Sequence, residues 1–356
     1  MFEHITVPAE CLQKEKYQRG QLGFEIDIPG DDISNSLKTY RLALLGLEGS
    51  AAATIRKTLY QYARPEALPR IIDLGNFTGT KNGQLLEIFM GLTQLEIIPI
   101  LLGGDEKFYR DMVAAMMHES NPMHWATVDK MQRTIPLLET LPVSKNRIQW
   151  HWMGVQKHLF QPMAGTQSNS DHLHYRLGVV RHDIKEMEPV IRDCSALEIH
   201  LCSVRSSEAP AHQDAGPSGF YSEEICQLSR YAGLSDQIRM LRVMGLDASM
   251  DVNGYSATCA AQSIWYFIEA IAQRKSDHPS VSDRMTSYTV SLKDPDLEII
   301  FVKSQRSGRW WMTIPDKEDG RTNYLSCSHK DYMMACQNIL PDRYLNATMT
   351  EHIHSL

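Results

Sequence analysis

The chain has 356 residues, of which 43% are hydrophobic and 22% are charged, and its formal net charge is -7 at pH 7. Such values are ordinary for a folded globular protein, so the composition argues against disorder. Because the sequence contains no run of Lys and Arg, the charge gives no electrostatic footprint for nucleic acid or an anionic membrane surface.

The beginning of the sequence lacks the basic and then apolar order of a secretory signal. No stretch approaches the roughly 18 uninterrupted apolar residues of a membrane span. Seven cysteines, an odd number without any C-x-x-C pair, indicate neither a disulfide framework nor a zinc knuckle. We therefore expect a cytoplasmic protein with reduced thiols and no membrane span.

Short apolar runs alternate with helix-patterned segments through the first three quarters of the chain. Eight runs are predicted to be strands: residues 40–47, 70–75, 97–102, 123–129, 147–153, 175–180, 196–202 and 239–246. Helical patterns cover residues 50–63, 220–233 and 256–275. Several strand candidates are almost continuously apolar, as expected for strands buried on both faces. The pattern predicts an α/β domain over residues 1–275, a three-layer sandwich with a mostly parallel sheet of about eight strands.

A different pattern follows the polar linker after Lys275. Residues 288–314 alternate between apolar and polar and contain turn sequences at 293–296 and 306–308, which is typical of antiparallel strands. We expect residues 276–356 to form a small antiparallel extension docked on the main domain. Trp310 and Trp311 fall on opposite faces of one strand, so one of them is expected to anchor the extension.

Open parallel sheets bind ligands at the carboxyl ends of their strands, where three motifs carry a family resemblance. They are "IIPILLGGDEKF" (97–108), "LEIHLCSVRSSEAPAHQDAGPSGFYSEEICQLSRYAG" (197–233) and "MGLDASMDVNGYSATCAAQSIWYFIEAI" (244–271). Together they resemble the ureohydrolases, the superfamily of arginase, agmatinase and formiminoglutamase, over residues 40–275. The formiminoglutamase-like branch is the most similar, and its members share the sequence around "GRWWMTIP" (308–315). The resemblance implies the arginase-like fold.

Active ureohydrolases hold two manganese ions with ligands from three motifs, and the resemblance implies that most of these ligands are absent here. The first motif offers "GGDE" instead of Gly-Gly-Asp-His, the second "DKMQR" instead of Asp-Ala-His-x-Asp, and the third "HLC" instead of Asp-x-Asp. The corresponding residues are Glu106, then Asp129, Met131 and Arg133, then His200 and Cys202. Only Asp129 keeps the residue type of the family.

Two of these replacements oppose metal binding on physical grounds. A guanidinium is never deprotonated to serve as a ligand, so Arg133 would place a fixed positive charge beside any cation. The thioether of Met131 is a soft donor that manganese does not favour. We expect Arg133 to replace the metals by pairing with Glu106 and Asp129. Glu106 is interpreted as the start of a helix, where a carboxylate complements the helix dipole.

The substrate side of the resemblance is also altered. Ureohydrolases grip the guanidino or amidino group with an acidic residue after a late strand of the sheet. Here Gly245 occupies that position, unless Asp247 replaces it after a shift. His172 and His174 could bind one metal ion together if they lay on a strand, but a solvated loop is the preferred interpretation.

Two functions remain open at this stage. The preferred one is a catalytically inactive ureohydrolase-like protein without a metal cofactor, acting as a binding, scaffold or regulatory component for a protein partner or small ligand. The alternative is a divergent hydrolase of amidine C–N bonds, with manganese or zinc in a site rebuilt from Glu106, Asp129 and His200, with Cys202 as a further donor. A homo-oligomer is compatible with both, and neither involves nucleic acid.

Overall fold

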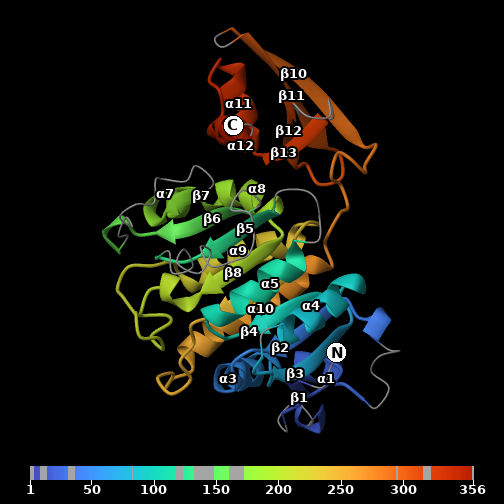
Figure 1. Ribbon diagram of the computed structural model, residues 1–356, viewed down its shortest axis with the longest axis vertical. Coiled ribbons are helices and arrows are strands. Elements are labelled where there is room, and N and C mark those ends of the chain that lie inside the picture. The colour runs from blue at the N-terminus through green and yellow to red at the C-terminus, as the bar shows by residue number, and fades with distance from the viewer. Residues whose placement is uncertain are drawn as a thin grey trace.

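A computed structural model describes residues 4–8, 14–30, 37–81, 83–117, 123–131, 148–159, 172–293, 296–315 and 322–354. Within these residues the chain forms two sheets, one of nine strands and one of four (Figure 1). The nine-stranded sheet lies in the larger part of the molecule, and the four-stranded sheet extends from one end of it.

The central sheet has the order β1-β3-β2-β4-β9-β8-β5-β6-β7. All neighbouring strands are parallel except β1 and β3. The strands are β1 (Ile5–Thr6), β2 (Leu42–Gly46), β3 (Ile71–Phe77), β4 (Ile98–Leu102), β5 (Met123–Val128), β6 (Ile148–Val155), β7 (His172–Arg176), β8 (Ala196–His200) and β9 (Met240–Met244). The predicted mostly parallel α/β sheet is confirmed, with the short antiparallel β1 as an addition.

One predicted strand is wrong in its position. The run 175–180 was expected to be extended, but β7 ends at Arg176 and the residues that follow form α7 (Leu177–His182). The solvated loop expected around His172 and His174 is also wrong, because both residues belong to β7. The His174 ring stacks on Trp152 of β6, with 5.5 Å between the ring centroids. The strand thus consists of the residues that pair with β6, whereas the apolar run had placed it a few residues later in the chain.

Helices cover both faces of the sheet (Figure 1). One face is packed by α3 (Gly49–Leu59), α9 (Ser222–Leu234) and α10 (Tyr255–Ile271), and the other by α4 (Gln84–Gln94) and α5 (Tyr109–Met116). The shorter helical elements are α1 (Leu22–Glu25), α8 (Met187–Arg192), and the 3-10 turns η2 (Lys14–Lys16), η3 (Leu37–Thr39), η4 (Glu106–Phe108), η6 (Lys157–Leu159), η7 (Ile184–Glu186) and η8 (Leu201–Ser203).

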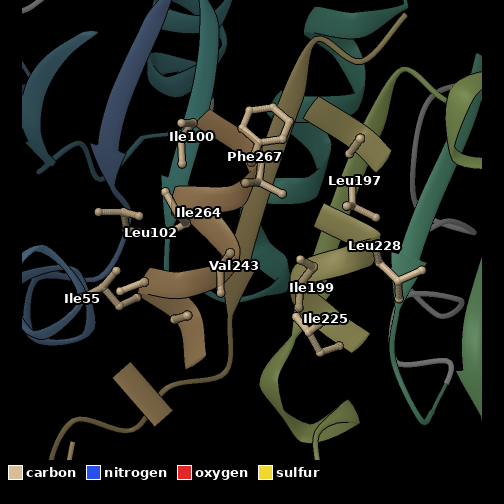
Figure 2. Close-up of a cluster of buried hydrophobic side chains, with 14 of the residues drawn as sticks. Ile55, Ile100, Leu102, Leu197, Ile199, Ile225, Leu228, Val243, Ile264 and Phe267 are labelled. Atoms are coloured by element: carbon tan, nitrogen blue, oxygen red, sulfur yellow. The ribbon is translucent and has the colours of Figure 1, made fainter. Parts of the chain in front are cut away.

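The largest apolar core lies between the sheet and α3, α9 and α10 (Figure 2). Alternation along each strand decides which side chains enter it, because successive residues point to opposite faces. On β8, Leu197 and Ile199 face this core, which also contains Val243 of β9. Each such side chain contributes about 1.5–3 kcal/mol on burial. The intervening residues of β8 and β9 therefore face α4 and α5.

The second sheet is antiparallel, with the order β10-β11-β12-β13. Its strands are β10 (Met285–Lys293), β11 (Asp296–Ser304), β12 (Trp310–Pro315) and β13 (Thr322–Cys327), followed by α11 (His329–Cys336) and α12 (Asp342–His354). Trp310 lies in the small core of this sheet, where its ring stacks on Tyr332. The predicted antiparallel arrangement is confirmed for residues 288–314, although residues 294–295 of the first turn lie outside the described residues.

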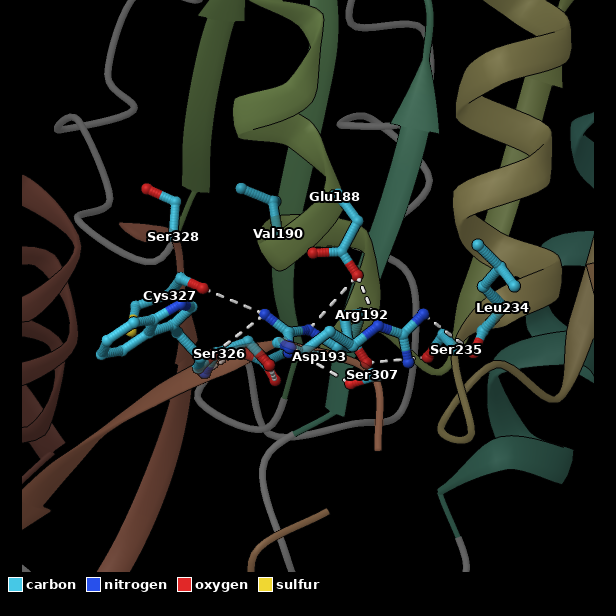
Figure 3. A network of polar contacts seen from close by, with 12 residues as sticks. Glu188, Val190, Arg192, Asp193, Leu234, Ser235, Ser307, Ser326, Cys327 and Ser328 are labelled. Carbon is cyan, nitrogen blue, oxygen red and sulfur yellow. Dashed lines mark hydrogen bonds and ion pairs between the residues drawn. The ribbon is translucent and has the colours of Figure 1, made fainter. Parts of the chain in front are cut away.

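Polar contacts join α8 to the second sheet (Figure 3). Arg192 donates from Nη2 to the carbonyl oxygens of Trp310 and Cys327, at 3.0 and 3.1 Å. Its guanidinium carbon lies 4.4 Å from the centroid of the Trp311 ring. Asp193 accepts from the backbone N–H of Ser326 at 3.0 Å and from its hydroxyl. Of the two tryptophans, Trp311 is the one whose ring contacts Arg192 at the end of α8.

Among the residues that the structure describes, no helix is both long enough and apolar enough to cross a membrane.

Candidate functional site

Four strands that are consecutive in the sheet end next to the residues predicted for the site. Their order is β4, β9, β8 and β5, and all are parallel. Gly103 follows β4, Gly245 follows β9, His200 ends β8 and Asp129 follows β5. Parallel strands bring their carboxyl ends to one edge, so this edge is the candidate site.

Asp129 is held in place by the turn that follows β5. Its Oδ1 accepts the backbone N–H of Met131 at 3.1 Å, which is the local bond that Asp commonly makes two residues on. The same oxygen accepts the Cys202 thiol, with 3.0 Å between Sγ and Oδ1. Both side chains are buried, with Asp129 3% and Cys202 0% exposed. The predicted convergence of these two positions is therefore observed.

His200 is the last residue of β8, and its imidazole lies against Gly245, which follows β9. Its Nδ1 accepts the backbone N–H of Cys202 at 3.1 Å, which caps η8. A Cβ placed on Gly245 would lie 2.4 Å from the imidazole Cε1 atom, and the φ of Gly245 is +87°. Few side chains adopt such a backbone conformation. The imidazole thus fills the space that a side chain at position 245 would need.

The observed hydrogen bonds of the Asp247 side chain are to Ser249 and not to Asp129, His200 or Cys202. Oδ1 of Asp247 accepts the backbone N–H and the hydroxyl of Ser249, at 3.0 and 2.5 Å. These hydrogen bonds lower the pKa of the Asp247 carboxyl. The side chain therefore stabilises the turn after β9.

Glu106 begins η4, which leads directly into α5, so the prediction that it starts a helix is confirmed for the backbone. The two glycines before it, Gly103 and Gly104, have φ values of +76° and +85° and make the turn out of β4. Arg133 and its predicted pairing lie outside the described residues.

Lys130 is a buried cation beside Asp129 that the motif comparison did not single out. It is 6% exposed, and its Nζ donates to the carbonyl oxygen of Asp214. Asp214 belongs to the loop of residues 205–219, which also accepts a hydrogen bond from Gln156 at Ser218, at 3.0 Å. The backbone of the same loop accepts from Asp247 N–H at Ala211, at 2.9 Å. The loop is thereby fixed to the ends of β5, β6 and β9.

A buried ion pair lies directly beneath this edge. Glu198 of β8 and Arg242 of β9 are both 0% exposed and are register partners, with 3.1 Å between Oε1 and Nη1. The carboxylate also accepts the Tyr109 hydroxyl and the Trp125 indole N–H. Arg242 donates to the carbonyl oxygen of Asp105 at 2.7 Å, which fixes the turn after β4. Burial raises the pKa of Glu198, while the guanidinium opposes that shift.

The sequence itself carries a signal for this pair. Each of two neighbouring strand candidates, 196–202 and 239–246, contains an internal charged residue in an otherwise apolar run. Opposite charges inside two buried strands that end at one edge indicate a cross-strand ion pair.

The donor atoms of Asp129, His200 and Cys202 all lie within 4.8 Å of one another. Among the residues that the structure describes, this is the only group of three or more acidic, histidine and cysteine side chains with such spacing. Asp129 follows β5, His200 ends β8 and Cys202 lies in η8, so the geometry of the sheet itself brings them together.

Comparison with solved structures identifies the class of fold. Formiminoglutamase from Trypanosoma cruzi with Mn2+ aligns with a TM-score of 0.59 and 15% identity, covering 66% of this chain and 95% of that one. Formimidoylglutamase from Bacillus subtilis gives a TM-score of 0.57 and 16% identity, with coverage of 72% and 94%. Agmatine ureohydrolase of Thermoplasma volcanium gives 0.56 and 15%, with coverage of 73% and 96%.

The chain therefore has the arginase-like fold found in the ureohydrolases. Formiminoglutamases are among the structures that it resembles, in keeping with the branch indicated by the sequence motifs. No protein-family model matches the chain, and no curated protein sequence matches it.

Proposed function

We propose that this protein keeps the arginase-like fold without two-manganese hydrolysis and serves as a binding, scaffold or regulatory component. The observation that carries the proposal is the packing of His200 against Gly245, where a Cβ would lie 2.4 Å from the imidazole. The position that resembles the family's substrate-gripping acid is thus occupied by a neighbouring side chain. Restoring that acid would require both His200 and the backbone to move.

Among the described residues, the donor set at the strand ends also does not fit a manganese pair. Two dications need several anionic oxygens and imidazoles, whereas this cluster offers one carboxylate, one imidazole and one thiol. The carboxylate oxygen already accepts two hydrogen bonds from the protein, from Met131 and Cys202. We therefore derive no hydrolytic step through manganese.

A hydrolysis assay with supplied metal tests the proposal. Purified protein would be incubated with Mn²⁺, Co²⁺ or Zn²⁺ and with formiminoglutamate, arginine or agmatine, and release of formamide or urea would be measured. We expect the wild type to release no more formamide or urea than the Asp129→Ala variant, which provides the background. Metal-dependent release that Asp129→Ala abolishes would restore the hydrolase interpretation.

The second candidate function is a divergent C–N hydrolase with a rebuilt metal site. The spacing of the Asp129, His200 and Cys202 donor atoms, all within 4.8 Å, favours it. Gly245 weighs against it, because a glycine offers no carboxylate to grip an amidine at that position. We place it second for that reason.

A further inference from the structure

Three side chains at the end of β5 and β8 have the composition of a transition-metal site. Asp129 follows Val128, which pairs with Ile199 of β8, and His200 and Cys202 come directly after Ile199. A carboxylate, an imidazole and a thiolate are all ligands that zinc accepts, usually in tetrahedral geometry. Manganese, by contrast, suits oxygen and imidazole donors and not sulfur.

We propose that Asp129, His200 and Cys202 bind one thiophilic divalent cation of the zinc and cobalt class. The site is mononuclear and leaves a coordination position for water or a further donor. This inference concerns metal binding alone, so it is independent of whether the protein hydrolyses any substrate. The sequence led us to expect no metal cofactor, whereas the proposed site would bind one ion whose ligand chemistry differs from that of the manganese pair.

The present distances are close to those that a tetrahedral ion requires. With bonds of about 2.3 Å to sulfur and about 2.0 Å to oxygen or nitrogen, ligand atoms lie about 3.3–3.6 Å apart. The Cys202 Sγ and Asp129 Oδ1 atoms are 3.0 Å apart, and all three donors lie within 4.8 Å. A bound ion therefore needs Sγ and Oδ1 to move slightly apart.

The proton in the Cys202–Asp129 hydrogen bond lies where the ion would bind. When the cation binds, the S–H bond breaks, a sulfur–metal bond forms and the proton leaves to solvent, with no change of oxidation state. Carboxylate, thiolate and dication then sum to zero charge. Neutrality suits a site whose Asp129 and Cys202 are 3% and 0% exposed, because an unbalanced buried charge is costly.

The protein holds two of the donors on rigid elements before any ion binds. Asp129 is fixed by its bond from the Met131 N–H, and Cys202 lies in η8 directly after β8. A metal on Nδ1 of His200 competes with the Cys202 N–H, which now donates to that atom at 3.1 Å. We therefore expect metal binding to alter the start of η8 while the strands remain unchanged.

Cobalt titration of the full chain tests the proposal, because a cobalt–thiolate bond has its own charge-transfer absorption in the near ultraviolet. Metal-free wild-type protein should gain this band and release a proton with one equivalent of Co²⁺. Zn²⁺ should then remove the band by displacing Co²⁺, without further proton release. Cys202→Ser should lose the band. Cys336→Ser, which removes an exposed thiol on α11, should keep it.

Asp129→Asn provides a second test if Cys202→Ser does not fold. This variant keeps the thiol, so the band should persist. Cobalt affinity should fall at least about tenfold, because the loss of even an outer-shell partner of a metal ligand costs about that much. No thiolate band in folded wild type at millimolar cobalt, or a band that survives Cys202→Ser, would overturn the proposal. Tighter binding of manganese than of cobalt would also overturn it. Manganese-dependent hydrolysis would instead contradict the proposed function and leave this readout unchanged.

Discussion

Removal of Arg192 should destabilise the protein, because this side chain joins α8 to the antiparallel sheet (Figure 3). It is 4% exposed, and Nη2 donates to the carbonyl oxygens of Trp310 and Cys327. The guanidinium also lies 4.4 Å from the Trp311 ring centroid. In Arg192→Ala both carbonyl oxygens lose a charged donor, and the tryptophan loses its cation.

The contacts allow the magnitude to be estimated. Hydrogen bonds to charged groups contribute about 1.5–3 kcal/mol each, and a desolvated cation over an aromatic ring about 2 kcal/mol. Two nitrogens, Nε and Nη1, have no hydrogen-bond acceptor within the described part of the chain, although Glu188 Oε1 lies 3.5 Å from Nε. Burial without full pairing lowers the pKa of Arg192 and reduces its net contribution. We therefore expect a loss of about 3 kcal/mol, the lower end for a broken buried charge contact.

Urea unfolding followed by circular dichroism and tryptophan fluorescence measures the effect. The control Lys185→Ala removes an exposed charge from the adjacent η7 and should change stability by less than about 0.5 kcal/mol. Trp311→Ala should cost about 3–5 kcal/mol, and the double variant should lose less than the sum, because the two side chains are in contact. Equal stability of Arg192→Ala and Lys185→Ala, or strict additivity with Trp311→Ala, would refute the assigned role of the guanidinium.

Three further outcomes follow from residues in the main sheet or directly after its strands. Burial lowers the pKa of His124 from 6.5 to about 4, so the unfolded chain binds the proton more readily and stability falls as the pH drops from 6.5 towards 4. The loss is at most about 3 kcal/mol, and urea unfolding at several pH values should show it in the wild type but not in His124→Asn. Gly245→Ala should lower the unfolding midpoint more than Gly254→Ala, since both have positive φ but only the first would contact the imidazole; equal midpoints would contradict the packing. Arg242→Ala should cost about 3–5 kcal/mol in the same assay by stranding its buried carboxylate partner, and a loss below about 1 kcal/mol would contradict the buried pair.

The fold was predictable because strands that are buried on both faces consist almost entirely of apolar residues. The runs around β2, β4 and β9 are nearly continuous in apolar residues, and every residue of these strands is buried. The prediction was wrong for 175–180, because Leu177, Val179 and Val180 fit a strand and a short helix equally well. Val179 is 63% exposed in α7, which no apolar pattern could indicate.

The site was predictable in position but not in contacts. The family resemblance and the predicted strand ends placed Asp129, His200 and Cys202 together, and the structure brings their donor atoms within 4.8 Å of one another. The contact of His200 with Gly245 could not be predicted, because it depends on the positive φ of a glycine and the rotamer of a side chain from another strand. The ammonium of Lys130 likewise reaches a carbonyl oxygen 84 residues away in sequence.

Charge balance at the carboxyl edge of the sheet links these observations. In a two-manganese site, anions from several strands need the metals to compensate them. Here Glu198 is compensated by Arg242, and Asp129 accepts hydrogen bonds from Met131 and Cys202. Ion pairing and hydrogen bonds within the chain thus stabilise both carboxylates. A single thiophilic cation fits that arrangement, since it would replace the Cys202 proton and leave the Arg242–Glu198 pair beneath it unchanged.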